Sequence, residues 1–136
     1  MGGTVIHDPA NLEMGVYSIQ INQDGQDDPL FQGLGHSFMA VSGHQERAID
    51  LPKPLTNLAS TPKCPFHAIK VSNQPIYGFQ FHPEVDAHDL KNRLIRYQSR
   101  YLESDSEVEK IMASIQETPK ANELISKFID LFLATS

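Results

Sequence analysis

The residues with the clearest chemical potential are His82 and Glu84, which stand on either side of Pro83. Side chains of an extended chain repeat every two residues, so the imidazole and the carboxylate can face the same side. Pro83 favours an extended conformation at His82, which supports that placement. A carboxylate bonded to one ring nitrogen fixes the tautomer and leaves the other nitrogen free to take a proton from a nucleophile. We therefore interpret His82 as a general base and Glu84 as the group that orients it.

A strand is expected to deliver this pair. Over residues 74–84, apolar and β-favouring side chains alternate up to the His-Pro-Glu end, which predicts a buried strand. Upstream, the pattern predicts strands at 14–21, 36–41 and 66–71 and a tight loop at 42–46. Gly43 would allow that loop an unusual backbone angle.

The character of the chain changes after Glu84, where polar residues and helix formers replace proline and glycine. Three helices are predicted: one from Asp86 to about Leu102, one that begins with a capping box at Ser104, and one that begins at Thr118-Pro119. The fold class expected from this order is α/β, with a sheet followed by a helical extension.

Composition excludes several classes of protein. The 136 residues fit one domain, and a formal charge of -6 without a basic run argues against nucleic-acid binding and against a polybasic membrane anchor. No apolar run approaches the length of a membrane span, and no signal peptide is visible. The single cysteine, Cys64, rules out an internal disulfide, which favours a cytoplasmic location.

Cofactor and metal motifs are not predicted. The six histidines show no pair at the i, i+2 or i, i+4 spacing of a local zinc cluster, so we expect no metal site. Gly33 and Gly35 lack the third glycine of a dinucleotide loop and are interpreted as a turn, so no cofactor is expected.

The string from Gly78 to Glu84 closely resembles the G-x-Q-F-H-P-E signature of class I, or triad, glutamine amidotransferases. The resemblance implies that His82 and Glu84 belong to a Cys-His-Glu triad that releases ammonia from L-glutamine for an acceptor still to be identified. Within the family, the chain is most similar to the GMP synthase type and its stand-alone relatives. Ser42-Gly43-His44 resembles the family segment that lies against the substrate glutamine; alternatively, His44 and Glu46 form a solvated turn.

The resemblance also implies a division of the chain and a missing group. Residues 1–85 are expected to be the carboxyl-terminal part of a flavodoxin-like amidotransferase sheet, and residues 86–136 a three-helix extension packed on it. The family carries its nucleophile in a G-x-C-x-G elbow, and no such string occurs here. Cys64 lies between prolines and is expected to be a small residue packed at a strand entry. We therefore expect the elbow to precede Gly2 and the isolated chain to lack glutaminase activity.

Two alternatives remain open. The chain could be a non-catalytic remnant or subunit that binds a protein partner, or itself, through an exposed sheet edge and face. It could also belong to a γ-glutamyl peptide hydrolase of the same fold.

Overall fold

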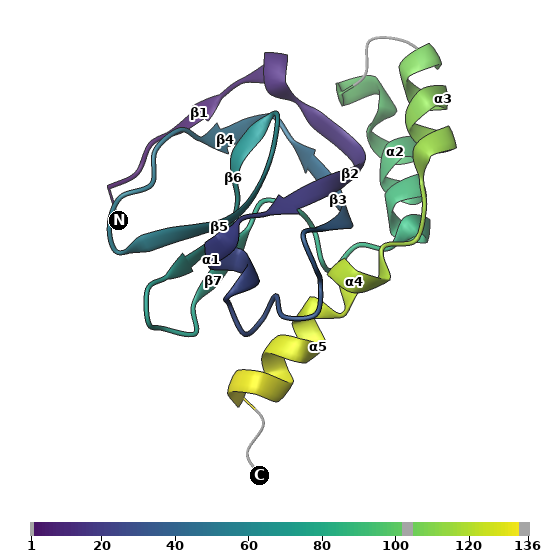
Figure 1. The fold of residues 1–136 in the computed structure, drawn as a ribbon. Helices are drawn as coiled ribbons and strands as arrows, with labels where there is room; N and C mark the ends of the chain where they lie inside the picture. Colours follow the sequence, from purple (N-terminus) through teal and green to yellow (C-terminus); the bar gives the residue numbers. More distant parts are fainter. Residues whose placement is uncertain (1, 102–104, 134–136) are drawn as a thin grey trace.

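The computed structural model of the chain describes residues 2–101 and 105–133, of which 97–101 and 105 are described by their backbone only. A curled sheet lies beside two longer helices, and the carboxyl-terminal helices run away from the base of the sheet (Figure 1). This mixture of strands and helices confirms the α/β class predicted from the sequence. None of the helices within residues 2–101 and 105–133 combines the length and the apolar character that a membrane span requires.

Among the described residues, the main sheet has five strands, and all their pairings are antiparallel. In spatial order they are β3 (Ser37–His44), β2 (Glu13–Ile21), β5 (Leu55–Thr61), β6 (Cys64–Val71) and β7 (Tyr77–Phe79). A separate ribbon pairs β1 (Val5–His7) with β4 (Glu46–Ala48). The strands predicted at 14–21, 36–41 and 66–71 therefore exist as β2, β3 and β6.

The strand that precedes the His-Pro-Glu segment is shorter and less buried than predicted. Instead of a buried strand over 74–84, β7 covers only Tyr77–Phe79, at the edge of the sheet, with half-buried residues. Asn73 adopts a left-handed φ of 62° in the preceding turn, and Pro75 has no N–H for a sheet ladder. The chain consequently turns until Ile76, which is why the alternating pattern overestimated this strand.

The segment that follows β7 links the two edges of the curled sheet. The backbone N–H of Gln80 donates to the carbonyl oxygen of His67 in β6 at 2.8 Å. The backbone N–H of His82 donates to the carbonyl oxygen of Val41 in β3, also at 2.8 Å. Since β7 and β3 are opposite edges, the chain passes from one to the other within a few residues. This crossing brings His82 beside β3.

The helices follow the sheet in the predicted order. They are α2 (Ala87–Tyr101), α3 (Asp105–Ser114), α4 (Pro119–Asn122) and α5 (Leu124–Phe128), followed by a π-helical turn at Ile129–Leu133. Two shorter elements lie between strands instead: α1 (Gln23–Gln26) and a 3-10 turn at Pro9–Asn11. The first two predicted helices correspond to α2 and α3. The third is divided into short consecutive pieces. The predicted helix end at Leu102 and the capping box at Ser104 lie outside the described residues.

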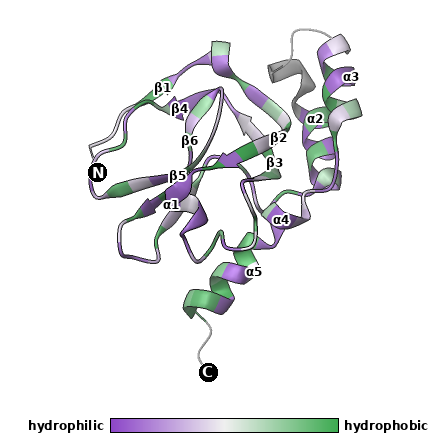
Figure 2. Cartoon of the chain, viewed as in Figure 1, coloured by the Kyte–Doolittle hydropathy of each residue, from purple (hydrophilic) through white to green (hydrophobic). Residues whose placement is uncertain are grey.

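Two apolar cores hold the sheet and helices together. The first, which includes Phe31, Phe38, Phe81 and Leu124, lies between the sheet and α4–α5. The second joins β3 to α2 through Val41, Val85, Leu90 and Leu94, with residues of β2 and α3 packed against it. Hydropathy drawn on the ribbon shows apolar residues on α5 and on the helices beside β2 (Figure 2). Together the two cores fix the segment between Phe81 and Val85 from both sides.

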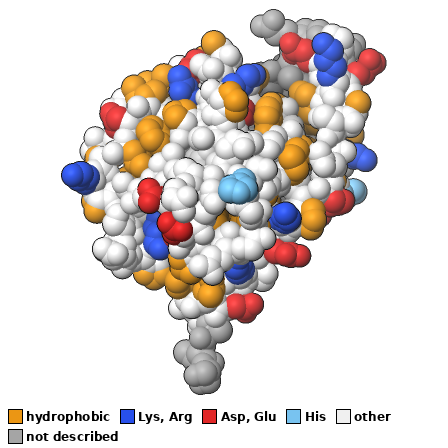
Figure 3. Space-filling view, in the orientation of Figure 1, with side chains coloured by type: hydrophobic (Ala, Val, Ile, Leu, Met, Phe, Trp, Pro, Cys, Tyr) orange, Lys and Arg blue, Asp and Glu red, His pale blue; other side chains and the backbone are white. Residues whose placement is uncertain are grey.

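Apolar side chains also remain on the surface. Within the described part of the chain, the large exposed ones are Val5, Ile49, Ile76, Ile95, Ile125, Ile129, Leu131 and Leu133. On the face shown in Figure 3, apolar groups are interspersed with single basic and acidic side chains. No continuous basic patch covers the described residues of this face.

Candidate functional site

His82 and Glu84 lie on the same side of their segment and share a hydrogen bond. The distance from His82 Nδ1 to Glu84 Oε1 is 2.8 Å, and the side chains are 33% and 50% exposed. A carboxylate accepts from the ring, so Nδ1 carries the proton and the Nε2 lone pair is available. The arrangement can therefore accept a proton at Nε2 and stabilise the resulting imidazolium.

The segment that carries the pair is anchored on both sides and braced from a helix. Phe81 is 1% exposed in the first core, and Val85 is fully buried in the second. In addition, Asn122 of α4 donates from Nδ2 to the carbonyl oxygens of Pro83 and Val85, at 3.0 and 2.9 Å. Sequence reasoning missed Asn122, because an asparagine within a helix carries no local signal of a contact with a segment almost forty residues earlier.

A cavity of about 710 Å³ lies next to the pair. Its lining includes His82, the Ser42–His44 segment, Phe79 and Arg93. Around one cavity the structure thus brings together His82 and the segment nominated for substrate contact, with Glu84 bonded to His82 outside the lining.

The segment Ser42–His44 is a strand rather than the predicted tight loop. It is the end of β3, where Glu13 pairs with His44, Met14 with Gly43 and Gly15 with Ser42. The prediction placed the strand end too early because it took Gly43 as a turn residue, whereas β2 supplies backbone partners as far as Glu13. The alternative of a solvated turn is also wrong for His44, whose side chain is only 5% exposed.

The side chains of Ser42 and His44 point toward buried Glu13. Ser42 Oγ donates to Glu13 Oε1 at 3.1 Å, and His44 Nε2 lies 2.7 Å from the same oxygen. His44 as a residue is half-buried although its side chain is almost fully buried, so its exposed part is backbone. What this segment presents to the cavity is therefore Gly43 and main-chain groups.

Glu13, which sequence reasoning did not single out, is the centre of a buried polar cluster. Its Oε1 also receives His67 Nε2 at 2.7 Å, and its Oε2 receives Thr61 Oγ1 at 2.7 Å. Burial by itself raises the pKa of Glu13, but the hydrogen bonds from His44, His67 and Thr61 outweigh it and hold the pKa well below its usual range. Burial lowers the pKa of His44, yet the adjacent Cys64 and Glu13 outweigh it and raise the pKa to about 9.

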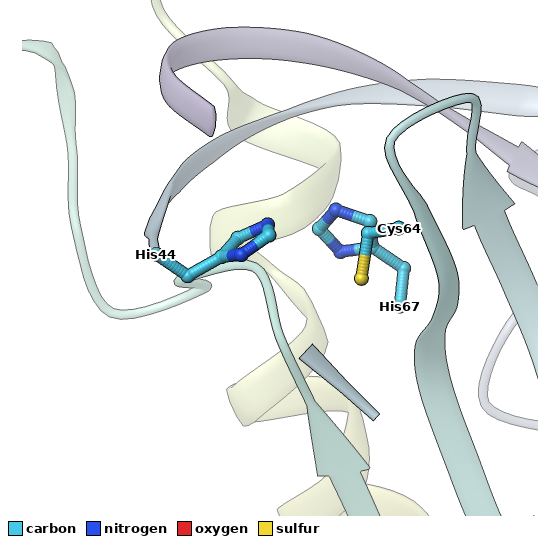
Figure 4. Close-up of side chains that lie close together, drawn as sticks. All are labelled: His44, Cys64 and His67. Carbon is cyan, nitrogen blue, oxygen red and sulfur yellow. The ribbon is translucent and has the colours of Figure 1, made fainter. Parts of the chain in front are cut away.

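Cys64 lies at the start of β6, fully buried, as its proline-flanked position predicted. His44, Cys64 and His67 each offer one ligand atom, and these three atoms lie within 4.8 Å of one another (Figure 4). On a regular strand the side chains of Cys64 and His67 would face opposite sides, so their spacing in the sequence did not predict that they lie close together. An irregular register between Ala59 and Thr61 of β5, opposite this stretch of β6, lets both side chains enter the same interior.

The comparisons with known proteins agree with the signature around His82. The family model for glutamine amidotransferase class-I matches residues 1–121. A GMP synthase (glutamine-hydrolyzing) from Gibberella zeae is 38% identical over 76 residues, which cover 55% of this chain and 14% of that protein. A relative from Methanosphaera stadtmanae, named as one subunit of GMP synthase (glutamine-hydrolyzing), is 38% identical over 60 residues, which cover 44% of this chain and 32% of the relative.

Solved structures agree in fold. A glutamine amidotransferase from Thermotoga maritima superimposes with a TM-score of 0.74 at 18% identity, covering 95% of this chain and 54% of that one. A protein from Thermoplasma acidophilum, described as a putative GMP synthase subunit, gives a TM-score of 0.56 at 26% identity, covering 80% and 53%. The chain thus spans about half the length of these structures and less of the curated relatives. With more than half of its residues matched by the family model, this chain belongs to the class I glutamine amidotransferases.

Proposed function

We propose that this chain supplies the histidine and the glutamate of a glutamine-hydrolysing site whose cysteine comes from outside these 136 residues. The observation that carries the proposal is the 2.8 Å bond between His82 Nδ1 and Glu84 Oε1 beside the cavity. Cys64 is a poor nucleophile for this site because it is fully buried. The nucleophile must therefore be a thiol other than that of Cys64.

In the proposed reaction, His82 takes a proton from the external thiol, and the thiolate attacks the side-chain amide carbon of glutamine. The carbon–sulfur bond forms, the carbon–nitrogen bond breaks, and His82 returns its proton to the departing ammonia. Water then attacks the glutamyl thioester with His82 again as base, which releases glutamate and the thiol. Glu84 keeps the ring in one tautomer and stabilises its charged form through both steps.

Substrate contact is proposed for Ser42, Gly43 and His44. Since the Ser42 and His44 side chains are held by Glu13, contact with glutamine would come from Gly43 and the main chain. The two side chains would act indirectly by fixing the end of β3. The proposed division into a sheet part, 1–85, and a helical part, 86–136, leaves the pair at the junction between them.

A protein partner is also proposed. The relatives from Methanosphaera stadtmanae and Thermoplasma acidophilum are named as subunits of GMP synthase, the second as a putative one, which favours a chain that works with another protein. The partner would bring the ammonia acceptor, and the exposed apolar side chains of the carboxyl-terminal helices are available for contact with it. A cytoplasmic location is proposed with it, on the ground of the single cysteine.

The test measures ammonia release from glutamine. The chain alone is expected to release none. If the chain alone hydrolysed glutamine, and His82→Ala abolished that activity, the proposed need for an external cysteine would be overturned. A chimera, in which the chain replaces the superimposed half of the Thermotoga maritima amidotransferase, is expected to be active. In that chimera His82→Ala should lower kcat by about 10²–10⁴-fold, the range for loss of a general acid–base.

The matched control is His36→Ala, because His36 is an exposed histidine of the same chain. It should leave the chimera's rate unchanged. Equal rates for His82→Ala and the unmodified chimera would reject the proposed role of His82. Preferential cleavage of γ-glutamyl peptides by the chimera would instead favour the hydrolase alternative.

A further inference from the structure

The interior of the sheet contains a second set of reactive side chains besides His82 and Glu84. Glu13 of β2 is 1% exposed, and its oxygens receive four groups: Ser42 Oγ, His44 Nε2, His67 Nε2 and Thr61 Oγ1. Because a carboxylate only accepts, both imidazoles donate through Nε2–H. A metal ion that binds such a ring displaces its Nδ1 proton, and the lone pair used for binding is then on Nδ1.

The Nδ1 atoms of His44 and His67 are buried and have no hydrogen-bond partner. Buried polar atoms without a partner are uncommon in native proteins, and each calls for a physical explanation. Cys64 is 0% exposed, and one ligand atom from each of these three side chains lies within 4.8 Å of the others (Figure 4). Two imidazoles and a sulfur thus surround one point inside the sheet.

We propose that His44, Cys64 and His67 bind a divalent transition-metal ion of the zinc type. The ligands would be the two Nδ1 atoms and the Cys64 thiolate, with a water molecule as the fourth ligand. Two imidazoles and a thiolate form a donor set that zinc and cobalt accept readily. Magnesium and calcium prefer oxygen ligands, and the oxygens of Glu13 are already engaged by the four groups named above.

Glu13 fits the supporting role that such a site requires. A histidine that binds a metal almost always donates its other ring N–H to a carboxylate or carbonyl, which fixes the tautomer and the orientation of the ring. Here one carboxylate receives both rings at 2.7 Å. Glu13 therefore already fixes the orientation of both rings, as a metal-binding histidine requires.

The size of the cluster is compatible with a tetrahedral ion. Zn–N bonds of about 2.0–2.1 Å and Zn–S bonds of about 2.3 Å place the ligand atoms roughly 3.3–3.7 Å apart. The ligand atoms, one from each side chain, lie up to 4.8 Å apart, so binding would require them to approach by about 1.1–1.5 Å at most. A bound ion would link β3, through His44, to β6, through Cys64 and His67, and so fix the strand end that the proposed glutamine segment occupies.

The proposal does not depend on glutamine chemistry, so its test uses the metal alone. Reduced, chelator-treated full chain is titrated with Co²⁺, which gives intense visible bands in tetrahedral sites and a charge-transfer band when a thiolate is bound. Since Cys64 is the single cysteine of the chain, that charge-transfer band identifies it without any substitution. We expect one ion per chain and displacement of Co²⁺ by Zn²⁺.

Substitutions then assign the ligands. Cys64→Ser, in which serine is close in size to cysteine, should abolish the charge-transfer band. Both Cys64→Ser and His67→Gln should weaken Zn²⁺ binding by about 100-fold or more. Glu13→Gln, which removes the carboxylate that orients the rings, should weaken Zn²⁺ binding by about 10- to 100-fold. His88→Gln, at an exposed histidine on α2, is the matched control and should bind as the unmodified chain does. Circular dichroism establishes that each variant is folded.

Three results would overturn the proposal. They are a Co²⁺ spectrum of the unmodified chain without a charge-transfer band, Zn²⁺ affinity unchanged in Cys64→Ser, and an equal loss of affinity in His88→Gln. The first is independent of whether any variant folds. None of the three bears on glutamine hydrolysis, so failure here is distinguishable from failure of the proposed function.

Discussion

His82 shares a hydrogen bond with one carboxylate at the surface, whereas His44 and His67 share another carboxylate inside the sheet. Glu84 is 50% exposed and Glu13 is 1% exposed, although both accept from a ring nitrogen at 2.7 to 2.8 Å. The attachment differs as well. His82 is held through Nδ1, while the buried rings are held through Nε2.

This difference decides what each group can do. With Nδ1 engaged, the Nε2 of His82 points away from the backbone and can reach a molecule in the adjacent cavity. With Nε2 engaged, the free Nδ1 atoms of the buried rings lie where solvent does not reach. The surface pair is suited to moving protons, and the interior cluster to holding strands together or binding an ion.

The largest expected effect separates the two carboxylates by stability. Glu13→Gln should lower the free energy of unfolding by about 3–5 kcal/mol, because it removes one side of a buried ionic cluster and leaves buried donors unsatisfied. Urea denaturation followed by circular dichroism measures this as a lower midpoint at a similar slope. A loss below about 1 kcal/mol would show that the cluster contributes little to stability and would remove the contrast with an exposed pair.

The surface pair was predictable from sequence, and the interior cluster was not. His82 and Glu84 are two residues apart, so local geometry alone places their side chains together. Glu13 is separated from Ser42 by 29 positions in the sequence and from His67 by 54 positions. Hydrogen bonds between such distant residues form only when the sheet has folded. The absence of a local histidine spacing therefore gave no information about a cluster assembled from four strands.

Errors in the predicted elements have a similar origin. The end of β3 was taken as a loop because Gly43 looks like a turn residue locally, but β2 provides partners that keep it extended. Conversely, the strand before His82 was predicted too long, since alternation in 74–84 does not reveal that β7 lies at an edge. Helices α2 and α3 were predicted well because helical periodicity is local.

A smaller effect is expected from the metal. If Zn²⁺ binds only the folded chain, a concentration 100 times the dissociation constant should raise the free energy of unfolding by about 2.7 kcal/mol. Denaturation with and without Zn²⁺, in the unmodified chain and in Cys64→Ser, measures the difference. The same rise in both proteins would place the ion elsewhere and return the interior cluster to a purely hydrogen-bonded role.

The smallest expected effect is on the surface pair itself. Glu84→Gln should change the free energy of unfolding by less than about 1 kcal/mol, because solvent screens an exposed pair and the glutamine can still accept from the ring. Phe81, Val85 and the Asn122 side chain would continue to hold the segment in place. The comparison is sharpest when the same urea titration is run on Glu13→Gln and Glu84→Gln. A loss above about 2 kcal/mol in Glu84→Gln would mean that the pair at the cavity also supports the fold, and its exposure would then no longer distinguish a catalytic arrangement from a structural one.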